Sequence, residues 1–153
     1  MSIIEVYDPS LDVLLVEDSP GDVRLTREIF DAANKGIRLH VVPDGVEAMA
    51  FLNREGTYAD APRPDLILLD LNLPRMDGRE VLMRIKQDAV LKSITTMILT
   101  TSDAEADITQ SYNLQANCFL TKPAQLEEFE RLVRNISDFW LTRVIFPQRG
   151  HST

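Results

Sequence analysis

Charged and hydroxyl side chains that could carry out chemistry follow the short apolar runs of this 153-residue chain. Glu17 and Asp18 come directly after one such run, and Asp70 comes directly after another. Thr100 and Lys122 close two later runs. Two carboxylates about 4 Å apart repel each other by about 4 kcal/mol at an effective dielectric of about 20. If these side chains meet, a cation must therefore compensate their charge.

The donor types indicate which cation and which reaction such a site would suit. Carboxylate oxygens, without clustered histidine or cysteine, are typical ligands of Mg²⁺, which keeps several waters and recruits phosphate oxygens. A carboxylate can also attack phosphorus and form an acyl phosphate when a metal, a lysine and a hydroxyl stabilise the charge. Asp70 is the best nucleophile candidate, because it follows the buried run L-I-L-L, whereas Glu17 and Asp18 lie beside a predicted helix start.

Each of these residues also has a plain structural explanation. Asp18 precedes Pro20, a pattern that equally suits a helix N-cap followed by proline at the first helical position. Asp70 can start a turn, Thr100 can be an ordinary strand-end hydroxyl, and Lys122 can be a solvated lysine. Only their joint placement favours a functional site.

The elements that must position these side chains alternate regularly. Short, nearly continuous apolar runs indicate strands buried on both faces of a parallel sheet, and we expect them at 12–16, 38–42, 65–69, 95–99 and 117–120. Amphipathic patterns predict helices at 20–34, 44–54, 78–88, 103–114 and 124–140. Five such units with right-handed crossovers predict a doubly wound α/β fold. Its ligands bind beyond the carboxyl ends of the strands, where the polar residues fall.

Composition narrows the class of protein. A chain with 44% hydrophobic and 26% charged residues is typical of one globular domain. The net charge of -8 argues against nucleic-acid binding. Cys118 is the only cysteine, which excludes an intramolecular disulfide and suits a core position. His40 and His151 have no ligand partners nearby in sequence. Without a secretory pattern or an apolar run of about 18 residues, we expect a cytoplasmic protein that does not enter a membrane.

The ordered set of motifs resembles the receiver domains of two-component response regulators, from about residue 12 to 139. The matching features are Glu17-Asp18, the run D-L-I-L-L-D-L-N-L-P-R-M-D-G at 65–78, Thr100 and Lys122-Pro123. The resemblance implies a five-stranded parallel sheet of order 2-1-3-4-5 with helices on both faces. It divides the chain into an N-terminal extension at 1–10, a receiver domain at 11–140 and an apolar tail at 141–153.

The resemblance also implies roles for the site residues. Asp70 would accept a phosphoryl group from a phosphohistidine of a sensor histidine kinase. Asp18, the Asp70 carboxylate and the backbone carbonyl of Asn72 would bind Mg²⁺ directly, and Glu17 would bind it through water. Lys122 would pair with Asp70 and later with its phosphoryl group.

Two further features are implied near the fifth strand. One is a cis peptide bond before Pro123, which would aim the lysine inward. The other is a switch in which phosphorylation recruits the Thr100 hydroxyl and lets Phe119 rotate inward, changing the surface of the fourth helix, fifth strand and fifth helix. Phe119 equally suits an ordinary strand aromatic, and it lacks the hydroxyl of the commoner tyrosine.

A finer resemblance concerns the partner. The runs I-L-T-T-S-D-A-E-A-D-I, A-N-C-F-L-T-K-P and D-F-W-L-T-R-V-I-F-P are similar to small response regulators paired with cyanobacterial and bacterial phytochromes. This similarity implies a phytochrome-type photoreceptor kinase upstream. A chain of one domain would pass the signal on by contact with a downstream protein.

The tail predicts an interface. The segment F-W-L-T-R-V-I-F-P at 139–147 is strongly apolar beyond the point where a receiver core is complete. Large exposed apolar patches usually mark interfaces. We therefore predict a symmetric homodimer through the fourth and fifth helices and the fifth strand, with Phe139, Trp140 and Phe146 near the contact. Packing of the tail on its own domain is the alternative.

Three other functions compete with this interpretation. Haloacid-dehalogenase-like phosphatases also form an aspartyl phosphate, but with a second acidic residue two positions after the nucleophile, where this chain has Asn72. A flavin carrier needs a hydroxyl-rich phosphate loop in place of Glu17 and Asp18. An adaptor without phosphorylation would not need the acidic set. We therefore expect a phospho-acceptor switch that takes part in its own phosphotransfer and dephosphorylation, and no enzyme acting on other substrates.

Overall fold

Five parallel strands form one sheet in the computed structural model, which describes residues 10–33, 36–101 and 116–140. The strand order is β2-β1-β3-β4-β5, as predicted. The strands are β1 (Leu11–Val16), β2 (Ile37–Val42), β3 (Leu66–Leu69), β4 (Thr95–Thr100) and β5 (Cys118–Thr121). Each begins and ends within one residue of its predicted range, and the doubly wound α/β class is confirmed.

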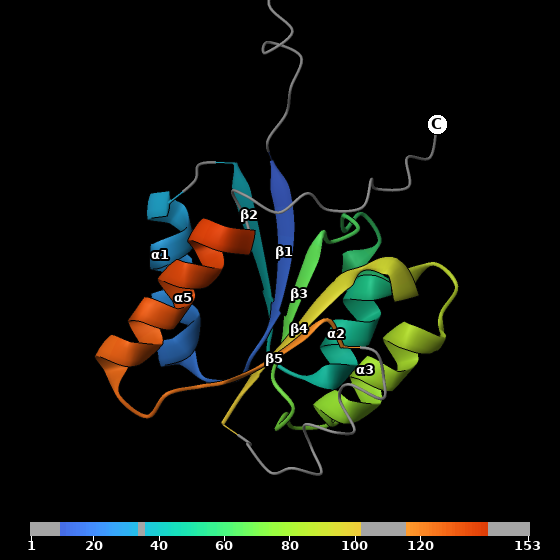
Figure 1. The fold of residues 1–153 in the computed structure, drawn as a ribbon. Helices are drawn as coiled ribbons and strands as arrows, with labels where there is room; N and C mark the ends of the chain where they lie inside the picture. The colour runs from blue at the N-terminus through green and yellow to red at the C-terminus, as the bar shows by residue number, and fades with distance from the viewer. Residues whose placement is uncertain (1–9, 34–35, 102–115, 141–153) are drawn as a thin grey trace, which may run out of the picture.

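Helices cover both faces of the sheet. On one face lie α1 (Pro20–Ala33) and α5 (Leu126–Trp140), and on the other lie α2 (Gly45–Leu52) and α3 (Gly78–Gln87) (Figure 1). The helix predicted at 103–114 lies outside the described residues. The short 3-10 helices η2 (Gly56–Tyr58) and η3 (Leu91–Ser93) occupy two connections. None of the helices that the structure describes has the length and apolarity needed to cross a membrane.

The sheet separates two apolar cores. Leu14 and Val16 of β1 belong to the core beneath α2 and α3, whereas Val13 and Leu15 belong to the core beneath α1 and α5. The residues of β3 are all buried. Because both faces of these strands are covered, their sequences are apolar at nearly every position rather than at alternate ones.

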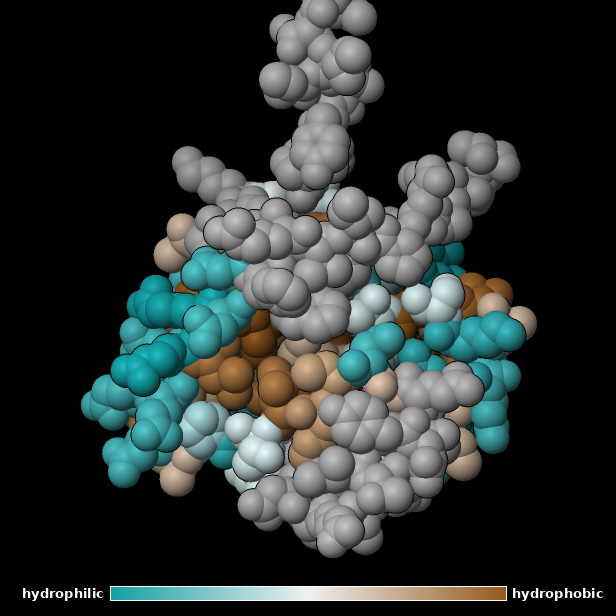
Figure 2. Space-filling model, viewed as in Figure 1, coloured by the Kyte–Doolittle hydropathy of each residue, from teal (hydrophilic) through white to brown (hydrophobic). Residues whose placement is uncertain are grey.

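The α5 helix packs on the sheet through apolar residues spaced three and four positions apart. Phe129, Val133 and Ile136 are buried in the core shared with α1. Leu126 is 65% exposed, because it begins the helix at the end that stands away from the sheet (Figure 1). In the space-filling view, hydrophilic side chains cover the outer side of α5 and apolar ones appear between this helix and the sheet (Figure 2).

Close backbone contacts fix the turn between β3 and α3. A Cβ added at Gly78 would lie 2.1 Å from the carbonyl oxygen of Asp70, and one added at Gly45 would lie 2.2 Å from a carbonyl oxygen of the same turn. Arg75 has a positive φ of 67°. Its guanidinium pairs with the Asp44 carboxylate at 3.2 Å, which offsets part of a backbone cost of about 1 to 3 kcal/mol.

A hydrogen bond beside α2 gives a testable pH dependence. The Tyr58 hydroxyl donates to Glu47 Oε1 at 2.6 Å. This bond, with burial and the charges of Glu47 and Asp44, raises the pKa of Tyr58 from 10.0 to about 12. The folded chain then holds the proton more tightly than the unfolded chain. The stabilisation is complete below the unfolded pKa and is lost as pH rises towards the folded one.

We therefore expect an ultraviolet titration of tyrosinate to show one group with a midpoint near pH 12 that is missing in Tyr58→Phe. Between pH 10 and pH 12, the variant should also lose the part of the fall in stability that deprotonation of Tyr58 causes. A titration curve that the substitution changes only near pH 10 would contradict the expectation.

Candidate metal and phosphoryl site

The carboxyl ends of the strands bring the predicted site residues to one edge of the sheet. Glu17 follows β1, Asp70 follows β3, Thr100 ends β4 and Lys122 follows β5. The parallel register places these ends side by side, because neighbouring strands pair residue by residue up to this edge. Glu17, Asp70 and Thr100 are buried there. Four side chains from separate parts of the sequence thus converge.

Both oxygens of the Asp70 carboxylate have hydrogen-bond partners. The Thr100 hydroxyl donates to Oδ1 at 2.7 Å, and the backbone N–H of Asn72 donates to the same oxygen at 3.0 Å. Lys122 Nζ donates to Oδ2 at 3.3 Å. The Asn72 side-chain amide in turn donates to Thr100 Oγ1 at 3.3 Å. These bonds fix the orientation of the carboxylate.

Lys122 supplies one positive charge among the carboxylates of the site. Its ammonium donates to Glu17 Oε1 and, at 3.0 Å, to Asp22 Oδ2, in addition to Asp70. Burial alone would lower the pKa of Lys122, but the bond to Glu17 and the neighbouring carboxylate charges outweigh burial and raise it. The lysine therefore stays charged throughout the physiological range of pH.

Glu17 is held in the site at an electrostatic cost. Burial raises the pKa of its carboxyl, the bond to Lys122 and the lysine charge partly offset this, and the charge of Asp70 raises it further. The backbone N–H of Ser19 donates to Glu17 Oε2 at 3.1 Å. The carboxylate thus gains more from an added cation than an exposed one would.

Asp22 is a site residue that the sequence analysis did not identify. It lies in the first turn of α1, where the helix dipole alone is enough to explain an acidic residue. The pattern that could have indicated it is an acidic residue in the first turn of the helix that follows Glu17 and Asp18.

Three carboxylates could hold a metal ion. Glu17, Asp18 and Asp70 each offer an oxygen, and these atoms all lie within 4.8 Å of one another. Their oxygens are hard donors, and their negative charge exceeds what Lys122 can balance. Such a site fits a hard divalent cation. A water-mediated role for Glu17 and a ligand role for the Asn72 carbonyl stay predictions.

The predicted cis peptide bond before Pro123 is wrong, because the peptide bonds of the described residues include none in cis. The backbone N–H of Lys122 donates to the Thr100 carbonyl at 2.7 Å, so the β5 register continues to this residue. From this trans backbone, Lys122 already reaches the carboxylates, and trans is the intrinsically favoured form of such bonds by about 0.5 to 1 kcal/mol.

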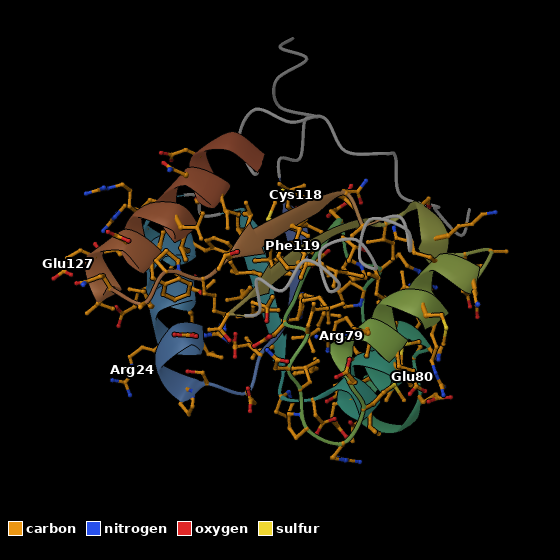
Figure 3. The ribbon with its side chains drawn as sticks, turned by 60° about the horizontal axis from the view of Figure 1, so that its bottom comes forward. Arg24, Arg79, Glu80, Cys118, Phe119 and Glu127 are labelled. Carbon is orange, nitrogen blue, oxygen red and sulfur yellow. The ribbon has the colours of Figure 1, made fainter. Side chains whose placement is uncertain are left out.

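The predicted switch and interface residues have different outcomes. Phe119 is half-buried on β5 and packs against the core beneath α2 and α3 (Figure 3). Its rotation stays a prediction. Phe146 and the side chains of Phe139 and Trp140 lie outside the described part of the chain. Cys118 is half-buried, and burial raises the pKa of its thiol, as suits a residue without reactivity.

Asp18 gives a direct test of the metal site. Outer partners of metal ligands already contribute about 10- to 100-fold to affinity, so the loss of a ligand in Asp18→Asn should weaken Mg²⁺ binding at least as much. Isothermal titration calorimetry measures the effect. Asp60→Asn, an exposed change in the connection before β3, at the opposite edge of the sheet, is the matched control. Equal affinities of the two variants would exclude Asp18 as a ligand.

Residues 13–134 match the response regulator receiver domain family, and the chain belongs to this family. Its predicted similarity to phytochrome response regulators is also confirmed, because one of these is 47% identical to the chain. Response regulator Rcp1 of Synechocystis sp. (strain ATCC 27184 / PCC 6803 / Kazusa) is 48% identical over 140 residues, which cover 92% of this chain and 95% of Rcp1.

Two solved structures show the same fold closely. The Mn(2+)-bound form of Rcp1 has a TM-score of 0.88 at 48% identity, with 90% of this chain and 99% of that chain covered. The phosphorylated cyanobacterial phytochrome response regulator RcpA has a TM-score of 0.88 at 47% identity, with 91% and 99% covered. The receiver fold predicted from the sequence is therefore confirmed.

Proposed function

We propose that this chain is a response regulator that accepts a phosphoryl group on Asp70 from a sensor histidine kinase, with Mg²⁺ as the bound metal. The observation that carries the proposal is the arrangement around Asp70. One carboxylate oxygen accepts bonds from Thr100 and Asn72, the other faces the Lys122 ammonium, and two more carboxylates lie within reach of a shared cation.

The chemistry is the transfer of a phosphoryl group between two side chains. A carboxylate oxygen of Asp70 attacks the phosphorus of a phosphohistidine, and the phosphorus–nitrogen bond breaks. The electron pair of that bond stays on the imidazole nitrogen, and the product is an acyl phosphate. Lys122 and the Thr100 hydroxyl stabilise the negative charge on the oxygens of the transferring phosphoryl group. Bound Mg²⁺ would neutralise charge on the same oxygens, and Glu17, Asp18 and Asp70 would hold it.

Signalling by protein contact follows from the same proposal. The similarity to RcpA, a cyanobacterial phytochrome response regulator, supports a phytochrome-type kinase as the donor. We infer that phosphorylation acts through Thr100 and Phe119 on the surface of β5 and α5, that the chain forms a homodimer through this surface and its apolar tail, and that a downstream protein binds there. The net charge of -8 disfavours nucleic acid as the target. The setting would be the cytoplasm, where such kinases present their phosphohistidine.

The chain would act on itself rather than turn over other substrates. An external phosphate ester would need a general acid to protonate its leaving group. The residue two positions after Asp70 is Asn72, whose side chain contacts Thr100. This arrangement supports a phospho-acceptor and disfavours a phosphatase.

Phosphorylation of the purified chain tests the proposal. Incubation with Mg²⁺ and acetyl phosphate, or with a phosphorylated phytochrome-type kinase, should give an acid-stable, base-labile phosphoryl group. Chelation of the metal should prevent it. Labelling without metal, or steady release of phosphate from p-nitrophenyl phosphate, would reject the proposed function. Sedimentation with and without acetyl phosphate tests the dimer, which a monomer at high micromolar concentration would exclude.

A further inference from the structure

Asp22 contacts the site through Lys122. Its Oδ2 accepts a hydrogen bond from Lys122 Nζ at 3.0 Å, a shorter distance than the 3.3 Å between the same nitrogen and Asp70 Oδ2. The carboxylates that could share a metal ion are those of Glu17, Asp18 and Asp70, and Asp22 is not among them. The contact with Lys122 is therefore what Asp22 contributes to the site.

The hydrogen-bonding capacity of Lys122 is fully used. An ammonium has three N–H donors and no acceptor. Glu17, Asp22 and Asp70 each accept from it. A phosphoryl group on Asp70 adds anionic oxygens that need the same donors, so Lys122 must weaken one of its present bonds to reach them.

The exposure of the three carboxylates indicates which bond is given up. The Asp22 side chain is 32% exposed, compared with 4% for Glu17 and 9% for Asp70. Water can replace the lysine at an exposed carboxylate more readily than at a buried one, because the buried carboxylate would be left without a partner. The bond to Asp22 is therefore the one that competes with the phosphoryl group.

We propose that Asp22 is a positioning residue that holds Lys122 in the unphosphorylated chain and thereby limits the stability of the phosphorylated state. This inference depends on the phospho-acceptor function proposed above. Asp22 acts through the lysine and does not touch the reacting atoms. A neutral side chain at position 22 leaves the ammonium available to the phosphoryl oxygens.

Beryllofluoride, which mimics a phosphoryl group on aspartate, tests the proposal in the presence of Mg²⁺. Asp22→Asn should bind it about fivefold more tightly than the unchanged chain, within the range of coupling between contacting residues. Asp22→Glu restores the carboxylate and should bind nearly as the unchanged chain does. Asp31→Asn removes the same charge from an exposed position on the same helix and should have no effect. Because Asp22 and Lys122 are in direct contact, the gain should persist at high salt.

Several results would overturn the inference. These are equal affinities for Asp22→Asn and the unchanged chain, the same gain in Asp31→Asn, or a gain that disappears at high salt, which would indicate a general effect of charge. An unchanged chain that binds no beryllofluoride with Mg²⁺ would instead reject the phospho-acceptor function itself.

A measurement without any ligand tests the contact separately. Urea unfolding of the metal-free protein measures how Asp22→Asn changes the free energy of unfolding. We expect this change to be more destabilising, or less stabilising, when Lys122 is present than in a Lys122→Met background. A stability effect of Asp22→Asn that is the same in both chains would show that Asp22 does not hold the lysine.

Discussion

An Asp70→Asn protein is expected to take up no phosphoryl group from acetyl phosphate, with or without Mg²⁺. The amide offers no anionic oxygen to attack phosphorus. The fold should persist, because the amide oxygen can accept the present bonds from Thr100 and Asn72, and Lys122 keeps other carboxylate partners. Intact-protein mass spectrometry measures the label, and circular dichroism verifies the fold.

The matched control for this prediction is Asp60→Asn, which replaces an exposed carboxylate in the connection before β3. It should be labelled as the unchanged chain is. Labelling of the Asp70→Asn protein to the same extent as this control would place the acceptor elsewhere, and Asp18, the exposed member of the acidic group, would be the next candidate.

Gly78→Ala is expected to lower the free energy of unfolding by about 3 kcal/mol or more, at the upper end of overpacking effects. The added Cβ would lie 2.1 Å from the Asp70 carbonyl oxygen and 2.7 Å from Leu71 Cα, which are backbone atoms that cannot rotate away. The Gly78 N–H also donates to the Leu71 carbonyl at 2.9 Å, so relief of the clash costs a hydrogen bond. Urea unfolding measures the loss.

Gly21→Ala separates this effect from the general consequence of replacing a glycine. Gly21 lies in the first turn of α1, and nothing stands within 4 Å of a Cβ added there. Alanine should stabilise the helix by up to about 1 kcal/mol. If the two substitutions changed stability in the same direction, the close approach at Gly78 would not matter.

The sequence predicts the strands well because the sheet is covered on both sides. A run such as L-I-L-L in β3 can be apolar throughout only if neither face meets water. This pattern therefore predicts both the strand and the residue at which it ends. The position of Asp70 follows directly, since the first polar residue after a buried parallel strand must lie at the ligand-binding edge. The same reasoning applies to Glu17, which directly follows the buried strand β1.

The remaining features depend on distances that no sequence pattern contains. Which carboxylate Lys122 contacts is decided by the reach of a flexible side chain from the edge strand β5 towards β1 and α1. Asp22 belongs to the site for this reason alone.

The contacts of Lys122 also bear on the order of folding. Its partners Glu17 and Asp22 lie 105 and 100 positions earlier in the sequence, so these bonds close nearly the longest loops available to the domain. Contacts of such separation form late, after local helices and neighbouring strands have assembled. The mutual repulsion of the carboxylates therefore opposes only the last steps of folding. A change of charge at this edge should consequently alter the rate of unfolding far more than the rate of folding.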